Sequence, residues 1–281
     1  MDYKRSDYLT FGKPQITEDE IAEVADTLRS GWIGTGPKVR AFEEQFAEYV
    51  GARHAVAVGS CTAALHLSLI VSGIGPGDEV ITTPLTFCAT ANAILHVGAV
   101  PVFVDIDPET MNIDIDQLEQ AITPRTKAIV PVHFAGRPID IAGLRQIANS
   151  HGLHIIEDAA HAIEAVSNGG KVGATGDSTC FSFYVTKNLT TGEGGMVTTE
   201  RDDWAEKLRT YSLHGLSRDA WSRFSKSGNA HYQVMCPGYK YNMTDIQASL
   251  GLHQFARLQK NHERRAEIWD RYDDPFSDLP I

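Results

Sequence analysis

The amino-acid sequence predicts an α/β protein built on a mostly parallel, doubly wound sheet with helices on both faces. Short apolar segments alternate with amphipathic segments along most of the chain, which is the order that produces βαβ units. The segment over residues 128–132 is apolar on both faces, as expected of a strand buried between two helical layers. With 281 residues, 42% of them hydrophobic, the chain is long enough to bury a large core.

The pattern predicts seven strands, at residues 54–58, 79–83, 100–105, 127–133, 153–157, 179–184 and 195–199. Helices are expected between them near residues 62–71, 86–96, 116–121, 139–150 and 202–213. Before the first strand, a capping box formed by Thr17 and Glu20 predicts a helix that runs to about Arg29, and a glycine-rich loop follows it. After the last strand, residues 245–272 are predicted to form one long, polar, arginine-rich helix.

These elements predict a large domain over residues 1–244, which includes an N-terminal arm over residues 1–37. The long helix would leave this domain and begin a second, smaller domain over residues 245–281. Only nine residues follow that helix, so we expect the smaller domain to be incomplete in this chain.

The chain is acidic, with 25 Lys and Arg residues against 36 Asp and Glu residues and a formal net charge of −11. Such a chain repels phosphate backbones and anionic lipid surfaces, so we expect neither nucleic acid nor a membrane as a main partner. The sequence contains no apolar run near the ~18 residues that a membrane span requires. Its start has no apolar core of a secretory signal.

Cysteine and histidine spacing favours a reduced, cytoplasmic protein without a structural metal. The cysteines lie far apart and form no CxxC pair, so we expect free thiols. A zinc hydrolase that used His151, His154 and His161 would lack both an HExxH motif and a suitably spaced fourth ligand. The four cysteines are Cys61, Cys88, Cys180 and Cys236.

The first motif with chemical meaning is the turn at Gly59 and Ser60, which joins an apolar strand to a helix. Backbone N–H groups at the start of a helix have no intrahelical partner, and the helix dipole favours an anion there. The turn therefore predicts a phosphate site. Ser60 could equally be an ordinary helix cap.

The second motif places Asp158 at the carboxyl end of a buried strand, where open α/β sheets carry their ligand-binding groups. His161 follows three residues later and is close enough in sequence to line the same pocket. The alternative is a helix-capping aspartate beside an ordinary histidine.

The third motif places Lys187 five residues after Ser182 and just before a glycine-rich stretch. An isolated lysine is usually a surface residue, but glycines permit close backbone approach and make burial in a site plausible here. A buried lysine can lose its proton and form a Schiff base. A phosphate site, a carboxylate for a pyridinium nitrogen and such a lysine are together the parts of a pyridoxal phosphate (PLP) site.

On these motifs the chain resembles the sugar-nucleotide aminotransferases of the DegT/DnrJ/EryC1/StrS family, which have PLP fold type I. The resemblance implies a mostly parallel seven-stranded sheet flanked by helices. It extends over nearly the whole chain and rests on the sequences GSCTAAL (59–65), GPGDEVI (75–81), EDAAHA (157–162), SFYVTKN (182–188), GEGG (192–195) and GYKYN (238–242).

The resemblance also implies a role for each matching residue. Lys187 would form the cofactor aldimine, Asp158 would pair with the pyridine nitrogen, and His161 would contact the 3-oxygen of the ring. Phe87 would stack on the ring. The cofactor phosphate would be held by Cys61 through its backbone, by Thr62 and Ser182, and by Asn242 of the neighbouring subunit, which implies a homodimer with shared active sites.

By the same resemblance, the reaction moves an amino group from glutamate to a keto sugar carried on a nucleotide. Residues 211–221 and 237–242 are most similar to enzymes acting on 4-keto sugars of UDP, such as 4-amino-4-deoxyarabinose aminotransferases. His214 and Trp221 would either line the sugar pocket or pack the loop that carries them. A dTDP-keto sugar, a keto-cyclitol and a catalytically impaired PLP-binding fragment are the alternatives.

Other functions fit less well. Dehydratases of the same family replace the lysine with histidine, whereas this chain has Lys187. A regulator would need a DNA-binding module, which neither the net charge nor any segment supplies. A nicotinamide dehydrogenase would need GxGxxG after the first strand, and the turn at Gly59 does not provide it.

Overall fold

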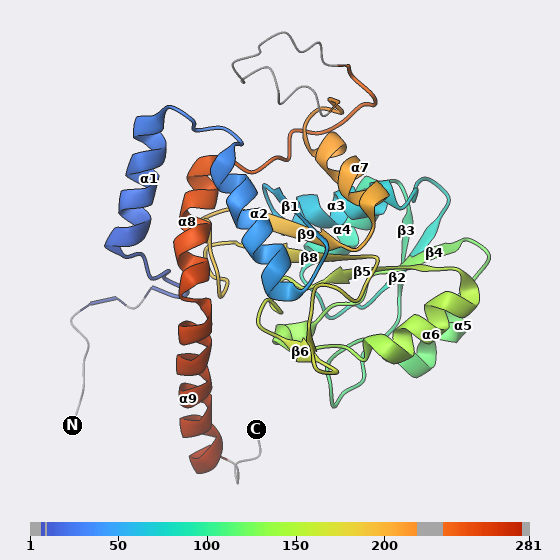
Figure 1. Cartoon of the computed structure of the whole chain (residues 1–281). Coiled ribbons are helices and arrows are strands. Elements are labelled where there is room, and N and C mark those ends of the chain that lie inside the picture. The colour runs from blue at the N-terminus through green and yellow to red at the C-terminus, as the bar shows by residue number, and fades with distance from the viewer. Residues whose placement is uncertain (1–6, 9, 218–232, 277–281) are drawn as a thin grey trace.

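The computed structural model describes residues 7, 8, 10–217 and 233–276, with the side chains of residues 274–276 left out. At its centre lies a seven-stranded sheet with the order β1-β9-β8-β5-β4-β2-β3 (Figure 1). Strand β9 runs antiparallel to β1 and β8, and the remaining pairs are parallel. The strands are β1 His54–Val58, β2 Glu79–Thr82, β3 Val100–Phe103, β4 Thr126–Ile129, β5 His154–Asp158, β8 Ser178–Ser182 and β9 Gly195–Thr199.

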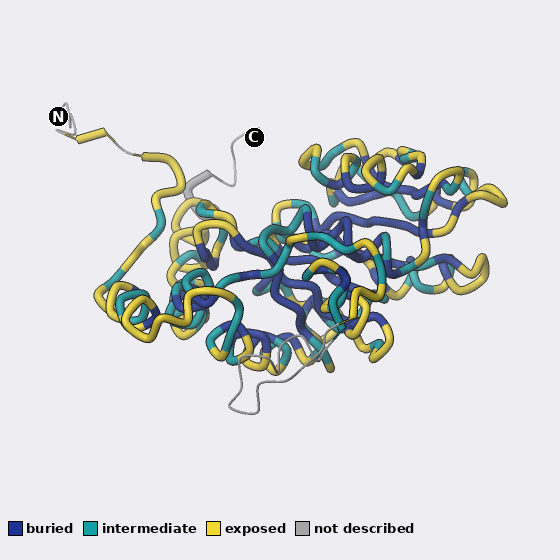
Figure 2. The backbone as a smooth tube through the Cα atoms, turned by 90° about the horizontal axis from the view of Figure 1, so that it is seen from above, coloured by how far each residue is buried: buried dark blue, intermediate teal, exposed yellow. Residues whose placement is uncertain are grey.

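Helices cover both faces of this sheet, so that the central strands are buried between two layers (Figure 2). One face packs against α3 Cys61–Val71, α4 Cys88–His96 and α7 Asp202–Ser212. The other face packs against α2 Pro37–Val50, α5 Leu118–Ala121, α6 Ile141–His151 and α8 Asp245–Ala256. The remaining elements are α1 Glu18–Ser30, η1 Ile115–Gln117, η2 Phe134–Gly136, the hairpin strands β6 Val166–Ser167 and β7 Gly170–Lys171, and α9 Leu258–Phe276. The predicted α/β class and mostly parallel sheet are confirmed.

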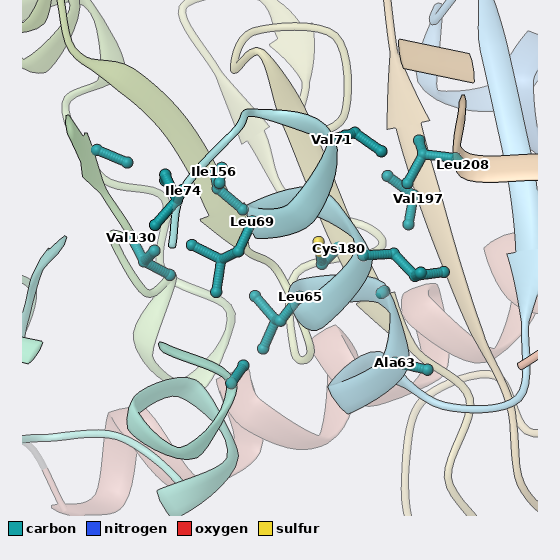
Figure 3. Packing of buried hydrophobic residues seen from close by; sticks show 14 of the residues in the cluster. Ala63, Leu65, Leu69, Val71, Ile74, Val130, Ile156, Cys180, Val197 and Leu208 are labelled. Carbon is teal, nitrogen blue, oxygen red and sulfur yellow. The ribbon is translucent and has the colours of Figure 1, made fainter. Parts of the chain in front are cut away.

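Helix α3 lies at the centre of the largest hydrophobic cluster. Its Leu65 and Leu69 point toward Val130 and Ile156 of the sheet region (Figure 3). Both leucines are 1% exposed, so truncating either to alanine should cost about 2–5 kcal/mol of stability. This packing fixes the first turn of α3 at one end of the sheet, beside the carboxyl ends of the parallel strands.

Helix α2 is not among the elements predicted from the sequence. Its first residue is Pro37, which is favourable at that position, and Phe42 and Phe46 are fully buried one turn apart. These two phenylalanines pack against Phe183, which precedes the glycine-rich stretch. The i, i+4 spacing of the two rings was an available signal for a helix.

The prediction of one continuous helix over residues 245–272 is wrong. The structure divides it at Arg257, whose φ of −104° and ψ of 0° lie between α8 and α9. The Arg257 guanidinium turns toward α1, where it donates to the carboxylate of Glu20 and to Thr17 Oγ1 (2.6 Å). The break therefore allows one side chain to hold the N-terminal cap of α1. The domain boundary predicted between residues 244 and 245 stays a prediction.

No helix among the described residues is long and apolar enough to cross a membrane.

Candidate active site

A cavity of about 620 Å³ opens at the carboxyl ends of the parallel strands, beside the first turn of α3. This is the position at which open α/β sheets bind their ligands. Seven of the eight predicted cofactor-binding residues line it, although they come from four separate segments of the chain. They are Cys61, Thr62, Phe87, Asp158, His161, Ser182 and Lys187.

The first turn of α3 offers backbone N–H groups to this cavity. Ser60 Oγ accepts the N–H of Ala63 at 3.1 Å, so this residue does cap the helix. The N–H groups of Cys61 and Thr62 come before the first intrahelical bond and have no intrahelical partner. A Cβ on Gly195 of β9 would lie 2.5 Å from the Ser60 carbonyl carbon, so only glycine lets the strand pass behind this turn. The helix cap and the anion site are therefore compatible.

Asp158 presents its carboxylate to the cavity while two groups hold it in place. Oδ2 accepts the hydroxyl of Thr90 at 2.7 Å, and Oδ1 accepts the N–H of Ala160 at 3.1 Å. The described residues 159–165 form turns and no helix, so Asp158 is not a helix cap. Each carboxylate oxygen can accept more than one hydrogen bond, so this 5%-exposed group keeps capacity for a ligand.

Lys187 lies in the turn after β8, where its N–H donates to the carbonyl of Tyr184 at 2.9 Å. Partial burial lowers the pKa of its ammonium, and the acidic groups of Cys61 and Asp158 offset only part of that effect. The neutral amine is therefore more available than in an exposed lysine. Partial burial, and then the charge of Lys187, also lower the pKa of His161, which lines the cavity and is an exposed residue.

The other predicted residues occupy different places. Phe87 is 78% exposed at the rim, directly before α4. Asn242 lines a neighbouring cavity of about 390 Å³, where its amide donates to Thr35 Oγ1 at 2.6 Å. His214 is exposed and is not among the residues that line the larger cavity. Trp221 lies outside the described residues.

Two further residues contact Asp158 and were not predicted from the sequence, Thr90 and His133. The backbone N–H of His133 donates to the carbonyl of Asp158 at 3.0 Å, and its ring donates from Nε2 to Glu157 at 2.8 Å. The ring also accepts the N–H of Ile139 at Nδ1, so two hydrogen bonds fix the orientation of the ring. Neither residue belongs to a motif with chemical meaning, since threonines and single histidines are common at the ends of elements.

The donor set fits pyridoxal phosphate. The cofactor carries a phosphate, an aldehyde and a pyridine nitrogen, and the cavity offers a helix N-terminus with two hydroxyls, an amine of lowered pKa and a carboxylate. Cys61 is unsuited to be a nucleophile, because burial and then the negative charge of Asp158 raise the pKa of its thiol.

Comparisons with known proteins agree with this chemistry. A family model described as the DegT/DnrJ/EryC1/StrS aminotransferase family matches residues 14–281. The chain is 56% identical over 277 residues to the spore coat polysaccharide biosynthesis protein SpsC of Bacillus subtilis, covering 99% of this chain and 71% of SpsC.

Solved structures are also similar. The putative sugar aminotransferase Spr1654 of Streptococcus pneumoniae, in its PMP form, matches with a TM-score of 0.90 and 41% identity over 96% of this chain and 73% of that one. Spr1654 has been solved in a PLP form as well. DesI, solved in the presence of its TDP-sugar product, matches with a TM-score of 0.85 and 37% identity over 97% of this chain and 67% of its own. The chain thus belongs to the DegT/DnrJ/EryC1/StrS aminotransferase family and is a pyridoxal-phosphate-dependent aminotransferase.

Proposed function

We propose that the protein transfers an amino group from glutamate to the keto carbon of a nucleotide-linked sugar. The observation that carries the proposal is the meeting of Lys187, Asp158 and the first turn of α3 in one cavity. The substrate class is supported by the relatives, since DesI was solved with a TDP-sugar product and SpsC is named for polysaccharide biosynthesis.

Each cavity residue then has a defined task. When bound, pyridoxal phosphate supplies an aldehyde that exchanges amino groups and a ring that withdraws electrons. The N–H groups of Cys61 and Thr62, with the hydroxyl of Ser182, hold its phosphate. Asp158 accepts the pyridine N–H and keeps that nitrogen protonated, because a nearby anion favours the charged form.

Lys187 moves a proton during the reaction, and Phe87 and His161 contact the cofactor ring. Nζ of Lys187 would take a proton from the α-carbon of the amino donor as a general base, and would then deliver this proton as a general acid to the cofactor carbon that carried the aldehyde. Its lowered pKa suits both steps, since a neutral amine is required first. Phe87 packs on one ring face, and His161 lies toward the ring oxygen.

Chemical trapping tests the lysine. The protein loaded with pyridoxal phosphate would be reduced with borohydride and digested, and its peptides mapped by mass. We expect the pyridoxyl group on Lys187. The control is Lys207→Ala on the exposed side of α7, which should label as the wild type does, whereas Lys187→Ala should not. A pyridoxyl group on another lysine of the wild type would contradict the proposal.

We further propose a homodimer in which Asn242 reaches the phosphate held by the partner subunit. Asn242 does not line the larger cavity of its own subunit, and the smaller cavity that it lines contains only Thr62 from the other predicted cofactor residues, which supports a role outside its own site. Lys187→Ala and Asn242→Ala are each expected to be nearly inactive alone. If sites are shared, mixed dimers of the two variants regain activity, because one of the two sites then lacks neither residue. If dimers that have exchanged subunits do not regain activity, the active sites are not shared between subunits.

The nucleotide and the donor are tested by a panel. Enzyme would be incubated with UDP- and dTDP-linked keto sugars and with several amino donors, and amino-sugar formation followed by mass. We propose a UDP-linked 4-keto sugar as the preferred acceptor, with the dTDP sugar as the second candidate because of DesI. His214→Ala and Trp221→Ala should alter the preference among sugars and leave the reaction of the donor amino acid unchanged.

A further inference from the structure

Asp158 is held by a threonine from another element, helix α4. Thr90, on helix α4 and 1% exposed, places its Oγ1 2.7 Å from Asp158 Oδ2. A second hydroxyl, Oγ1 of Thr86, lies 2.7 Å from Thr90 Oγ1. Thr86 itself lines the cavity. The two threonines therefore form a chain of hydroxyls from the cavity wall to the carboxylate.

The direction of this chain follows from the number of hydrogens. An ionised carboxylate can only accept hydrogen bonds, so the single hydroxyl hydrogen of Thr90 must be donated to Asp158. Thr86 must then donate to Thr90, whose oxygen still has lone pairs. The carbonyl of Phe87, at 3.2 Å from Thr90 Oγ1, is the competing acceptor, but it is more distant and uncharged.

The two carboxylate oxygens are held by different means. Oδ1 accepts the N–H of Ala160, which is part of the same turn and moves with it. Oδ2 depends on Thr90, 68 residues away in sequence and on another element. Only the Thr90 contact ties the plane of the carboxylate to α4, the helix that begins directly after Phe87.

We infer that Thr90 is a positioning residue for the transamination, acting through Asp158, and that Thr86 supports it. This inference rests on the proposed function, in which Asp158 accepts the pyridine N–H. The hydrogen bond from Thr90 fixes the direction of the carboxylate.

Three variants test the inference. Thr90→Val keeps the shape and removes the donor, and Thr90→Ser keeps the donor. Thr82→Val is the matched control, because Thr82 is a fully buried threonine of β2 whose hydroxyl donates to the carbonyl of Val130 at 2.8 Å, away from the cavity lining. The readouts are the rate of the half-reaction with the amino donor at saturation, the donor concentration at half-saturation, and the melting temperature.

We expect Thr90→Val to slow the half-reaction about 10- to 100-fold, the loss expected for a hydrogen bond to a charged group. The donor concentration at half-saturation should change little. Thr90→Ser should restore most of the rate, and Thr82→Val should lower the melting temperature without slowing the reaction. Thr86→Val, which leaves the Thr90 donor in place, should slow it a few-fold.

The outcomes separate the inference from the function. If borohydride labels Lys187 but Thr90→Val reacts as fast as the wild type, the inference is wrong and the proposed function stands. If Thr82→Val slows the reaction as much as Thr90→Val, the effect is one of general stability and the inference is also wrong. If Thr90→Val does not fold, an unchanged rate in Thr86→Val overturns the hydroxyl chain. If borohydride does not label Lys187 in the wild type, both the proposed function and the inference about Thr90 are wrong.

Discussion

Two adjacent carboxylates at the end of β5 lie in opposite surroundings. Glu157 is fully buried and accepts from the ring of His133, the N–H of Gly176 and the hydroxyls of Thr175 and Thr179. Asp158 borders the cavity and accepts from two groups among the residues that the structure describes. Successive side chains of a strand point to opposite faces, so neighbours in sequence serve different regions of the molecule.

The difference shows how to tell a structural carboxylate from one with a chemical task. Four donors nearly saturate Glu157, and it has no direction left in which to bind a ligand. Burial would raise the pKa of Glu157, but the hydrogen bonds from His133 and the two threonines outweigh it and lower the pKa. Asp158 has the same chemistry and free lone pairs. Accessibility and unused acceptor capacity therefore distinguish the two.

The largest effect on activity should come from Asp158→Asn. We expect the variant to bind cofactor and to react with the amino donor about 10²–10³-fold more slowly, because a neutral amide cannot keep the pyridine nitrogen protonated. Rapid mixing with glutamate, followed by cofactor absorbance, measures this rate. A loss of only a few-fold would mean that Asp158 serves the structure, as Glu157 does.

Glu157→Gln should give the reverse result. Its amide would place N–H groups against donors, leaving buried polar groups unsatisfied, and we expect a loss of about 1–3 kcal/mol in the free energy of unfolding. The half-reaction should slow only a few-fold, since Glu157 reaches the cavity only through His133. Chemical denaturation and the same rapid-mixing assay measure both quantities. A large rate loss in a fully stable variant would reverse the assignment of the two carboxylates.

The comparison between the two regions also predicts a pH dependence. The pKa of Glu157 is lower in the folded protein than the ordinary 4.5, so its contribution to stability is complete above that pH. The contribution is lost as the pH falls through the folded value, because the unfolded chain then takes up the proton more readily. The stability gap between wild type and Glu157→Gln should therefore narrow on acidification below about pH 4.5. A gap that stays constant would show that folding does not lower the pKa of Glu157.

The features of the fold and site that the sequence predicts correctly depend on residues close together in the chain, whereas those it does not predict depend on residues far apart. Asp158 and Lys187 follow apolar strands directly, so a short window of sequence indicates their position. The bond from Thr90 to Asp158 spans 68 residues, and no local pattern distinguishes this threonine from one that merely begins a helix. The break at Arg257 likewise has no local signal in the sequence, and the carboxylate that its side chain contacts, Glu20, lies on the first helix. Contacts between distant elements decide such features.

His161→Ala should have the smallest effect and sharpens the contrast with Asp158, three residues before it. Partial burial and the charge of Lys187 lower the pKa of His161 below its ordinary 6.5, so its ring is neutral at neutral pH. A neutral ring offers the cofactor one uncharged hydrogen bond, worth about 0.5–1.5 kcal/mol, and its loss should slow the half-reaction about 2- to 12-fold.

The pH dependence of the half-reaction rate tests whether the effect of His161→Ala comes from the loss of an uncharged hydrogen bond. Because the ring stays neutral above its lowered pKa, the ratio of wild-type to His161→Ala rates should be constant from neutral to mildly alkaline pH. A ratio that changes across that range would show that the histidine carries charge during the reaction. If His161→Ala slows the half-reaction as much as Asp158→Asn does, both Asp158 and His161 stabilise the charge of the protonated cofactor ring.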